Sequence, residues 1–194
     1  MNRRKLLSTM SVLAGSLIAP PLFGIDSATA KGTKTRSSHR VYAPMPIGYQ
    51  KVGQIENIPP LILYGVALQE SSMMFGPQSL PYPWTLNVAG APKRFASYDA
   101  AVAALCANVA RGVTSVDCGL MQVNWRYHSA KLVNFYRALD PYPNLQAGAT
   151  ILRGHFKDTG DWFKSVGRYH NGADPQRAHA YATSVFQRMA VLHA

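Results

Sequence analysis

Glu70 is the residue of this sequence best placed to act as an acid. It lies near the end of a run that opens with Pro59 and Pro60 and stays largely apolar up to Ser71. A carboxyl group beside apolar neighbours, in the last turn of a helix where carbonyl ends are exposed, holds its proton more tightly than in water. Such an acid can donate a proton near neutral pH. Glu56 is the only other glutamate, and the position of Glu70 also fits a surface residue at a helix end.

Glu70 must be held by a helix, and the sequence predicts one over residues 58–74. The two prolines fit its first turn, because the amide hydrogen that proline lacks has no partner there within a helix. Leu61, Tyr64 and Leu68 then recur at helical spacing. We therefore expect a mostly buried helix with Glu70 in its last turn.

The rest of the pattern predicts a mostly helical single domain with one small β-hairpin. Residues 84–88 have strand character, and the turn formers after them can lead the chain back through residues 93–95. Ser97 fits as the cap of the next helix and Gly112 as the residue just past its end. Residues 113–124 are expected to be extended or irregular. Later helices are predicted over residues 129–139, 144–157 (capped by Asn144), 161–169 and 175–192.

The amino terminus has the pattern of an export signal: a basic start, an apolar stretch and a small-residue cleavage site at residues 28–30. Prolines and Gly24 interrupt the apolar stretch, which argues against a membrane-spanning helix, although a retained anchor is the alternative. Paired arginines also resemble a twin-arginine signal. Either route predicts a periplasmic protein. We divide the chain into a signal peptide (1–30), a flexible basic leader (31–51) and one domain (52–194).

The mature chain is strongly basic. The full sequence has a formal net charge of +11, and removing the three basic residues and one acidic residue of the signal leaves +9. Such a surface favours polyanions, and an exported protein meets acidic wall polymers before it meets DNA. No block of basic residues is interleaved with aromatic ones, so we expect no nucleic-acid binding. The histidines are scattered and no glycine-rich phosphate loop follows a strand, so we expect no metal and no cofactor. A monomer is expected.

Cys106 and Cys118 are the two cysteines of the chain. An exported protein with an even number of cysteines more often pairs them than leaves them free. A bond between them would close a short loop and stabilise the fold by about 3 kcal/mol in the chain-entropy model. We predict a structural disulfide, the alternative being a reactive thiol.

Four motifs follow one another along the chain: Glu70-Ser71, Gly119-Leu120-Met121-Gln122, Asn144-Leu145-Gln146-Ala147-Gly148-Ala149 and Tyr169. In order and rough spacing they resemble the motifs of the soluble lytic transglycosylases, which share the fold of goose-type lysozyme. The similarity runs from about Pro59 to His170 and implies a lysozyme-like (goose-type) helical domain that acts on peptidoglycan glycan strands. The string from Val116 to Asn124 is most similar to the small exported members that accompany conjugation and type IV secretion machinery, whose components would be partners.

The resemblance implies a role for each motif. Glu70 would protonate the oxygen between N-acetylmuramic acid and N-acetylglucosamine and then take a proton back, while the muramic 6-hydroxyl attacks its own anomeric carbon to give a 1,6-anhydro end. A usual glycosidase needs two carboxylates, and we interpret Asp117, the one obvious second candidate, as a turn residue. Hydrolysis of the same glycosidic bond is the alternative to formation of an anhydro end. Residues implied to contact the substrate or the acid are Ser71, Gly119, Leu120, Met121, Gln122, Asn144 and Tyr169, the last with its hydroxyl near Glu70.

One departure from the family follows Tyr169. The family usually continues its tyrosine with Asn-Ala-Gly, whereas this sequence has His170-Asn171-Gly172. The contacts of His170 and Asn171 are therefore not implied by the resemblance.

Two rival hypotheses come from other classes. The segment Asp117–Leu120 is similar to the nucleophile segment of the NlpC/P60 cysteine peptidases, with Cys118 paired to His155 or His170. That family normally has a serine between its cysteine and glycine, and a disulfide would silence the thiolate. The other rival is a non-catalytic wall-binding scaffold of a secretion complex.

Overall fold

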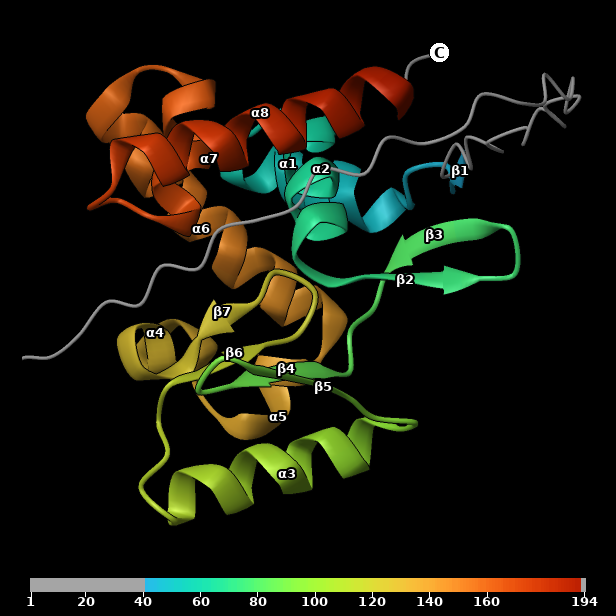
Figure 1. Ribbon diagram of the computed structural model, residues 1–194, viewed down its shortest axis with the longest axis vertical. Helices are drawn as coiled ribbons and strands as arrows, with labels where there is room; N and C mark the ends of the chain where they lie inside the picture. The colour runs from blue at the N-terminus through green and yellow to red at the C-terminus, as the bar shows by residue number, and fades with distance from the viewer. Residues whose placement is uncertain (1–40, 193–194) are drawn as a thin grey trace, which may run out of the picture. The chain divides into compact units, whose positions relative to one another are not determined.

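The computed structural model describes residues 41–192, which are mostly helical with two small sheets (Figure 1). This confirms the predicted fold class. No helix in this part of the chain is both long and apolar enough to cross a membrane. The helices are α1 (Ile47–Glu56), α2 (Pro60–Ser71), α3 (Tyr98–Ala110), α4 (Trp125–Leu132), α5 (Phe135–Leu139), α6 (Pro141–Thr159), α7 (Trp162–His170) and α8 (Pro175–Leu192). The strands are β1 (Val41–Tyr42), β2 (Ser72–Phe75), β3 (Gln78–Pro81), β4 (Thr85–Val88), β5 (Ala91–Arg94), β6 (Val116–Cys118) and β7 (Val123–Asn124).

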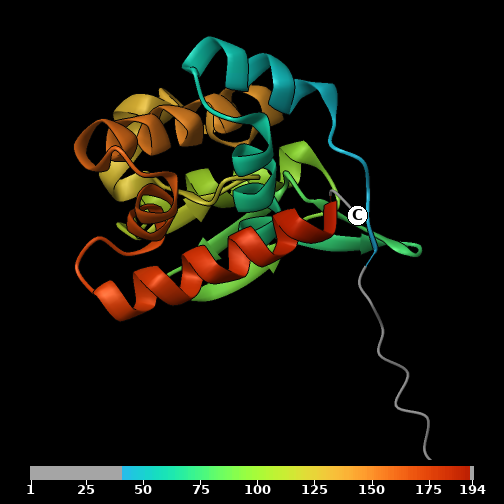
Figure 2. The same ribbon diagram turned by 90° about the horizontal axis from the view of Figure 1, so that it is seen from above.

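The core is built around α2, as the apolar run in the sequence predicts. Every residue from Ile62 to Leu68 is buried, and a helix that is apolar on all sides is expected to be enclosed. It packs against α1 and α8, and Figure 2 shows α8 lying across it. The Tyr64 hydroxyl donates a 2.7 Å hydrogen bond to the carbonyl of Ala43, which anchors the chain entering α1. This packing fixes the direction in which the last turn of α2 presents its side chains.

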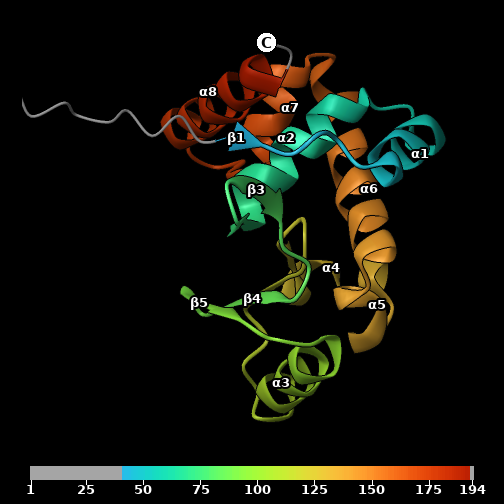
Figure 3. The same ribbon diagram turned by 90° about the vertical axis from the view of Figure 1, so that its right-hand side faces the viewer.

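The long helix α6 connects the helical elements to the four-stranded sheet. Figure 3 shows α6 running from α5 at its amino end toward α1 and α7, with which it is in contact. The sheet has the order β5-β4-β6-β7, with all neighbours antiparallel. β4 pairs with β5, which confirms the predicted hairpin. Leu86 of β4 also pairs with Cys118 of β6, so the segment expected to be extended or irregular adds strands to this hairpin.

A second sheet, with the order β1-β3-β2, was not predicted. Its β2–β3 hairpin turns at Gly76, which has a positive φ of 58°. The strands are short, and one of them ends in a proline, so their pairing depends on tertiary contacts more than on strand propensity. The hairpin begins directly after α2, so the helix ends at Ser71 and not at residue 74 as predicted.

Two other predicted boundaries were wrong. The leader does not extend to residue 51: α1 begins at Ile47, and its Tyr49 is buried against Tyr64 with ring centroids 4.9 Å apart. The predicted helix over residues 129–139 is two helices, α4 and α5, separated where Val133 has a φ of 67°. The predicted signal peptide lies outside the described residues.

Candidate active site

Glu70 lies in the last turn of α2, as predicted, and its half-buried carboxyl has a specific partner. The Tyr181 hydroxyl, from the middle of α8, donates a hydrogen bond to Glu70 Oε1. Burial raises the pKa of Glu70 to about 7; the hydrogen bond from Tyr181 lowers it, and the negative charge of Asp117 raises it. A carboxyl with this pKa is protonated in about half of the molecules at neutral pH, so it can donate a proton there.

Two cavities meet at Glu70. One, of about 460 Å³, lies between α2, α7 and the four-stranded sheet, and the other, also about 460 Å³, lies between α2 and α8. Glu70 and His170 are the residues that line both. Because the acid stands between the two cavities, an extended ligand lying through both would pass it with one unit on each side.

The Gly119–Gln122 turn forms part of the cleft wall, but most of its side chains point inward. Gly119, Leu120 and Met121 are buried, and Met121 has no exposed surface. Only Gln122 of this motif lines the cavity, with a left-handed φ of 46° and its amide donating to the Gly119 carbonyl at 2.9 Å. The expected packing of Met121 against sugar was therefore wrong: its side chain fills the space above Gly148 of α6, where a Cβ atom would come within 2.7 Å of it.

Ser71 also supports the wall instead of contacting the cavity. Its side chain is buried and its hydroxyl donates to the carbonyl of Leu120 at 2.8 Å and of Ala67 at 3.1 Å. The residue next to the acid is thus bonded to the wall of the cleft.

Asn144 is a structural residue of the turn, not a helix cap or a substrate contact. Asp140 caps α6, and Asn144 is fully buried inside its first turn. Its Nδ2 donates to the carbonyls of Cys118 at 2.8 Å and Ala138 at 2.9 Å, and its Oδ1 accepts from the Met121 amide at 2.9 Å. Gly119 passes so close that a Cβ atom there would lie 2.7 Å from the Asn144 amide. Asn144 therefore fixes the backbone of the turn.

Tyr169 lines the cleft, but its hydroxyl donates to the carbonyl of Met121 at 2.7 Å. Burial and the charges of Glu70 and Asp117 raise its pKa well above the ordinary value, so it stays a hydrogen-bond donor. The direct hydrogen-bond partner of Glu70 is instead Tyr181 of α8.

Asp117 is not a turn residue. It belongs to β6, lines the same cavity as Glu70, and accepts a 2.7 Å hydrogen bond from Asn124. Burial raises its pKa, whereas the hydrogen bond and the nearby His170 lower it. The strand alternation could have shown that Asp117 and Cys118 face opposite sides, since Cys118 belongs to the core.

Three more residues of this cavity were missed. The side chains of Asn87, Tyr127 and His128 line it, and the Tyr127 ring is 73% exposed. Asn87 Oδ1 and His128 Nδ1 are buried without a hydrogen-bond partner, and His128 interrupts α4 with a non-helical φ of −131°. Burial lowers the pKa of His128, so it is mostly neutral at pH 7. In the sequence, the one signal was an aromatic residue, Tyr127, between two polar ones.

The predicted disulfide is absent, because the two cysteines lie in different environments. Cys106 is on the exposed side of α3, and Cys118 is buried in β6, and both are free thiols. Burial and the charge of Asp117 raise the pKa of Cys118 well above its usual value, which opposes formation of the thiolate that a cysteine peptidase needs. The peptidase hypothesis is not favoured. Among residues 41–192, no three His, Cys, Asp or Glu side chains are grouped to hold a metal ion.

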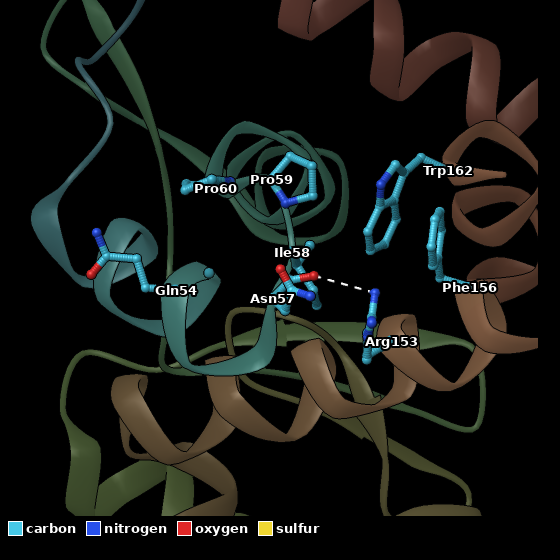
Figure 4. A pocket seen from close by; sticks show the side chains of 9 residues that line it. Gln54, Asn57, Ile58, Pro59, Pro60, Arg153, Phe156 and Trp162 are labelled. Atoms are coloured by element: carbon cyan, nitrogen blue, oxygen red, sulfur yellow. Dashed lines mark hydrogen bonds between the residues drawn. The ribbon is translucent and has the colours of Figure 1, made fainter. Parts of the chain in front are cut away.

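Another cavity lies at the opposite end of α2. It measures about 570 Å³ and opens at the start of α2, beside Pro59 and Pro60 (Figure 4). Phe156 and Trp162 stack there with centroids 4.0 Å apart, and the Arg153 guanidinium lies 5.3 Å from the Phe156 centroid. None of its lining side chains is a carboxylate. It offers no acid, so we place the candidate active site at Glu70.

Comparison with known proteins shows the family of this chain. Residues 49–185 match the family model of the transglycosylase SLT domain. No curated protein and no solved structure was found to match the chain. The family match covers well over half of the 194 residues and includes Glu70, the Gly119–Gln122 turn and Tyr169. The chain therefore belongs to the transglycosylase SLT domain family, whose members are peptidoglycan lytic transglycosylases.

Proposed function

We propose that Glu70 is the general acid and then the general base that cleaves the β-1,4 bond between N-acetylmuramic acid and N-acetylglucosamine. One observation carries this proposal: a carboxyl with a pKa of about 7 stands between two cavities that could hold the sugars on either side of the bond. A general acid works best when its pKa is near the working pH, because it is then protonated and still a good donor.

The proposed reaction needs one proton and no water. Glu70 donates its proton to the glycosidic oxygen while the bond from that oxygen to the muramic anomeric carbon breaks. The Glu70 carboxylate then accepts the proton of the muramic 6-hydroxyl, whose oxygen forms the new bond to the anomeric carbon. The products are a 1,6-anhydro end and a free 4-hydroxyl, and Glu70 is protonated again.

Neighbouring groups support both states of Glu70. The negative charge of Asp117 favours the protonated acid that starts the reaction, and the Tyr181 hydroxyl stabilises the carboxylate that follows. Burial is the main cause that raises the pKa of Glu70 to about 7, and these two smaller effects oppose each other. Along the cleft, Gln122 offers hydrogen bonds and the exposed Tyr127 ring offers a face on which a sugar can stack.

The cellular setting is also a proposal. The signal-like amino terminus supports export to the periplasm, where peptidoglycan lies. The string from Val116 to Asn124 resembles small members that accompany conjugation and type IV secretion machinery. We therefore propose that the enzyme opens the wall locally for assembly of such an apparatus and contacts its components.

Replacing Glu70 by Gln tests the catalytic role. The amide keeps the size of the side chain but is not an acid near neutral pH, so it cannot transfer a proton to the glycosidic oxygen. We therefore expect clearing of purified murein to fall at least 100-fold, the range that general acid catalysis supplies. Glu56→Gln is the matched control, because Glu56 lies on α1 outside both cavities. Retained clearing by Glu70→Gln would reject the assignment, and loss on Cys118→Ala with intact folding would favour the peptidase. A folded wild type that clears nothing would favour the scaffold.

Mass spectrometry of the released muropeptides tests the second half of the mechanism. Anhydro ends are expected. Reducing ends would instead indicate hydrolysis, for which Asp117, in the same cavity as Glu70, is the available second carboxylate.

A further inference from the structure

We propose that His170 is a positioning residue: it holds the Tyr181 ring by stacking and thereby keeps the Tyr181 hydroxyl on the Glu70 carboxyl. This inference rests on the proposed role of Glu70 and extends it to a residue that no motif assigns. It is carried by one chain of contacts from α7 through α8 to α2.

The first contact is a ring stack. His170 is the last residue of α7, and its imidazole lies 4.5 Å from the Tyr181 ring between centroids, with the two planes only 3° apart. His170 is exposed, whereas Tyr181 is only 7% exposed. The imidazole therefore covers one face of a ring whose remaining surface is enclosed by the protein.

The second contact joins the same ring to the acid. The Tyr181 hydroxyl donates to Glu70 Oε1, and a hydrogen bond weakens when the direction of the donor changes. The hydroxyl lies at the end of a rigid ring, so any tilt of the ring moves it. Since His170 stacks on that ring, its imidazole restricts the tilt and so the position of the hydroxyl.

Histidine suits this position because it combines a flat ring with a polar edge. His170 lines both cavities that meet at Glu70, so its free edge faces the space where substrate and water lie. An aliphatic side chain could not stack in this way, and a short amide has no ring. The charged and titratable groups around Glu70 are Asp117 of β6, Tyr169 and His170 of α7, Tyr181, Arg177 and Arg188 of α8, Arg94 of β5 and His128 of α4.

The pH dependence of murein clearing distinguishes positioning from a merely structural role. The hydrogen bond from Tyr181 lowers the pKa of Glu70, so weakening it raises that pKa and moves the loss of activity at high pH upward. On the alkaline side of the pH–activity profile (its basic limb), we expect His170→Ala to move the pH of half-maximal activity upward by about 0.5 pH unit. Tyr181→Phe should move it further, because that substitution removes the hydrogen-bond donor. His170→Phe keeps a flat ring and should return the limb to its wild-type position, even if the rate changes.

A double variant gives a second readout. If His170 acts through Tyr181, combining His170→Ala with Tyr181→Phe should cost no more in apparent kcat/KM than Tyr181→Phe alone. Circular dichroism and a thermal melt of the full-length protein confirm that each variant is folded.

Three outcomes would overturn the inference. The basic limb of His170→Ala could coincide with that of the wild type. The losses in apparent kcat/KM of the two single variants could add in the double variant. Finally, His170→Phe could shift the basic limb as far as His170→Ala does. The last result would show that the charge of the imidazole acts, not its ring. These failures are separate from that of the proposed function, because Glu70→Gln would still be inactive.

Discussion

The two ends of α2 differ in the chemistry that their surroundings offer. The amino end, at Pro59 and Pro60, faces a cavity of about 570 Å³ with a stacked aromatic pair and an arginine (Figure 4). The carboxyl end carries Glu70 between two smaller cavities of about 460 Å³ each. Only the second end has a carboxyl whose pKa is shifted to about 7 by burial. The chemistry of the lining, not the volume of the space, therefore favours the carboxyl end as the candidate active site.

The ends also differ in how they are built. At the amino end, the arginine makes one long hydrogen bond, 3.4 Å to the Asn57 carbonyl. At the carboxyl end, Ser71 and Tyr169 donate hydrogen bonds to backbone carbonyls of the Gly119–Gln122 turn. Asn144 donates to the carbonyl of the neighbouring Cys118 and accepts from the backbone amide of Met121 in the turn. The carboxyl end of α2 is thus surrounded by a connected hydrogen-bond network. We therefore expect substitutions there to have larger effects on activity than substitutions at the amino end.

The largest effect in this comparison is expected from Gly119→Ala. Gly119 has a φ of 73°, and the added Cβ would lie 2.7 Å from the Asn144 amide that holds the turn. We expect a loss of about 3 kcal/mol in the free energy of unfolding in urea, with little clearing activity left. The control is Gly154→Ala, in α6 with open space around it, which should stabilise the protein by up to about 1 kcal/mol. Equal stabilities of the two variants would contradict the interpretation that Asn144 holds the Gly119–Gln122 turn in a fixed conformation.

A smaller effect is expected from Asp117→Asn. The Asp117 charge raises the pKa of Glu70, so its removal lowers that pKa and moves the basic limb of the pH–activity profile downward. We expect activity at pH 8 to fall about fivefold, and less at pH 6, where Glu70 stays protonated. Asparagine keeps an oxygen that can accept from Asn124. An upward shift of the limb would show that Asp117 does not act on Glu70 by its charge.

The smallest effect on activity is expected at the other end of α2, from Trp162→Leu. The substitution removes the stack on Phe156 and should cost about 1 kcal/mol of stability, measured as a lower Tm. Clearing of murein below the melting range should stay within twofold of the wild type. A tenfold loss in the folded variant would mean that this cavity also contacts the glycan and that the contrast between the two ends is wrong.

The sequence predicts well those features that depend on local signals. The burial of α2 follows from its unbroken apolar run, and the Ser97 cap of α3 accepts from the Ala100 amide at 3.2 Å, as a cap should. The place of Glu70 in the last turn of α2 follows from the length of the same run. These features need no knowledge of distant segments.

The sequence fails where a role depends on contacts between distant segments. Tyr181 is 111 residues from Glu70, and nothing in its helix distinguishes it from a core tyrosine. Asn144 precedes an apolar helix, which is the pattern of a cap, but Asp140 takes that position and Asn144 turns inward. The cysteine count predicts a disulfide only if the two side chains approach each other, and the exposure of Cys106 depends on how α3 packs.

The hydrogen bond from the Ser71 hydroxyl to the carbonyl of Leu120 links the helix end that carries Glu70 directly to the wall of the cleft. A displacement of the last turn of α2 is therefore transmitted to the wall through one hydroxyl group. Under the proposed function, a glycan strand would meet the acid and the wall as one unit, so a misfit between strand and cleft would have to be relieved by the strand.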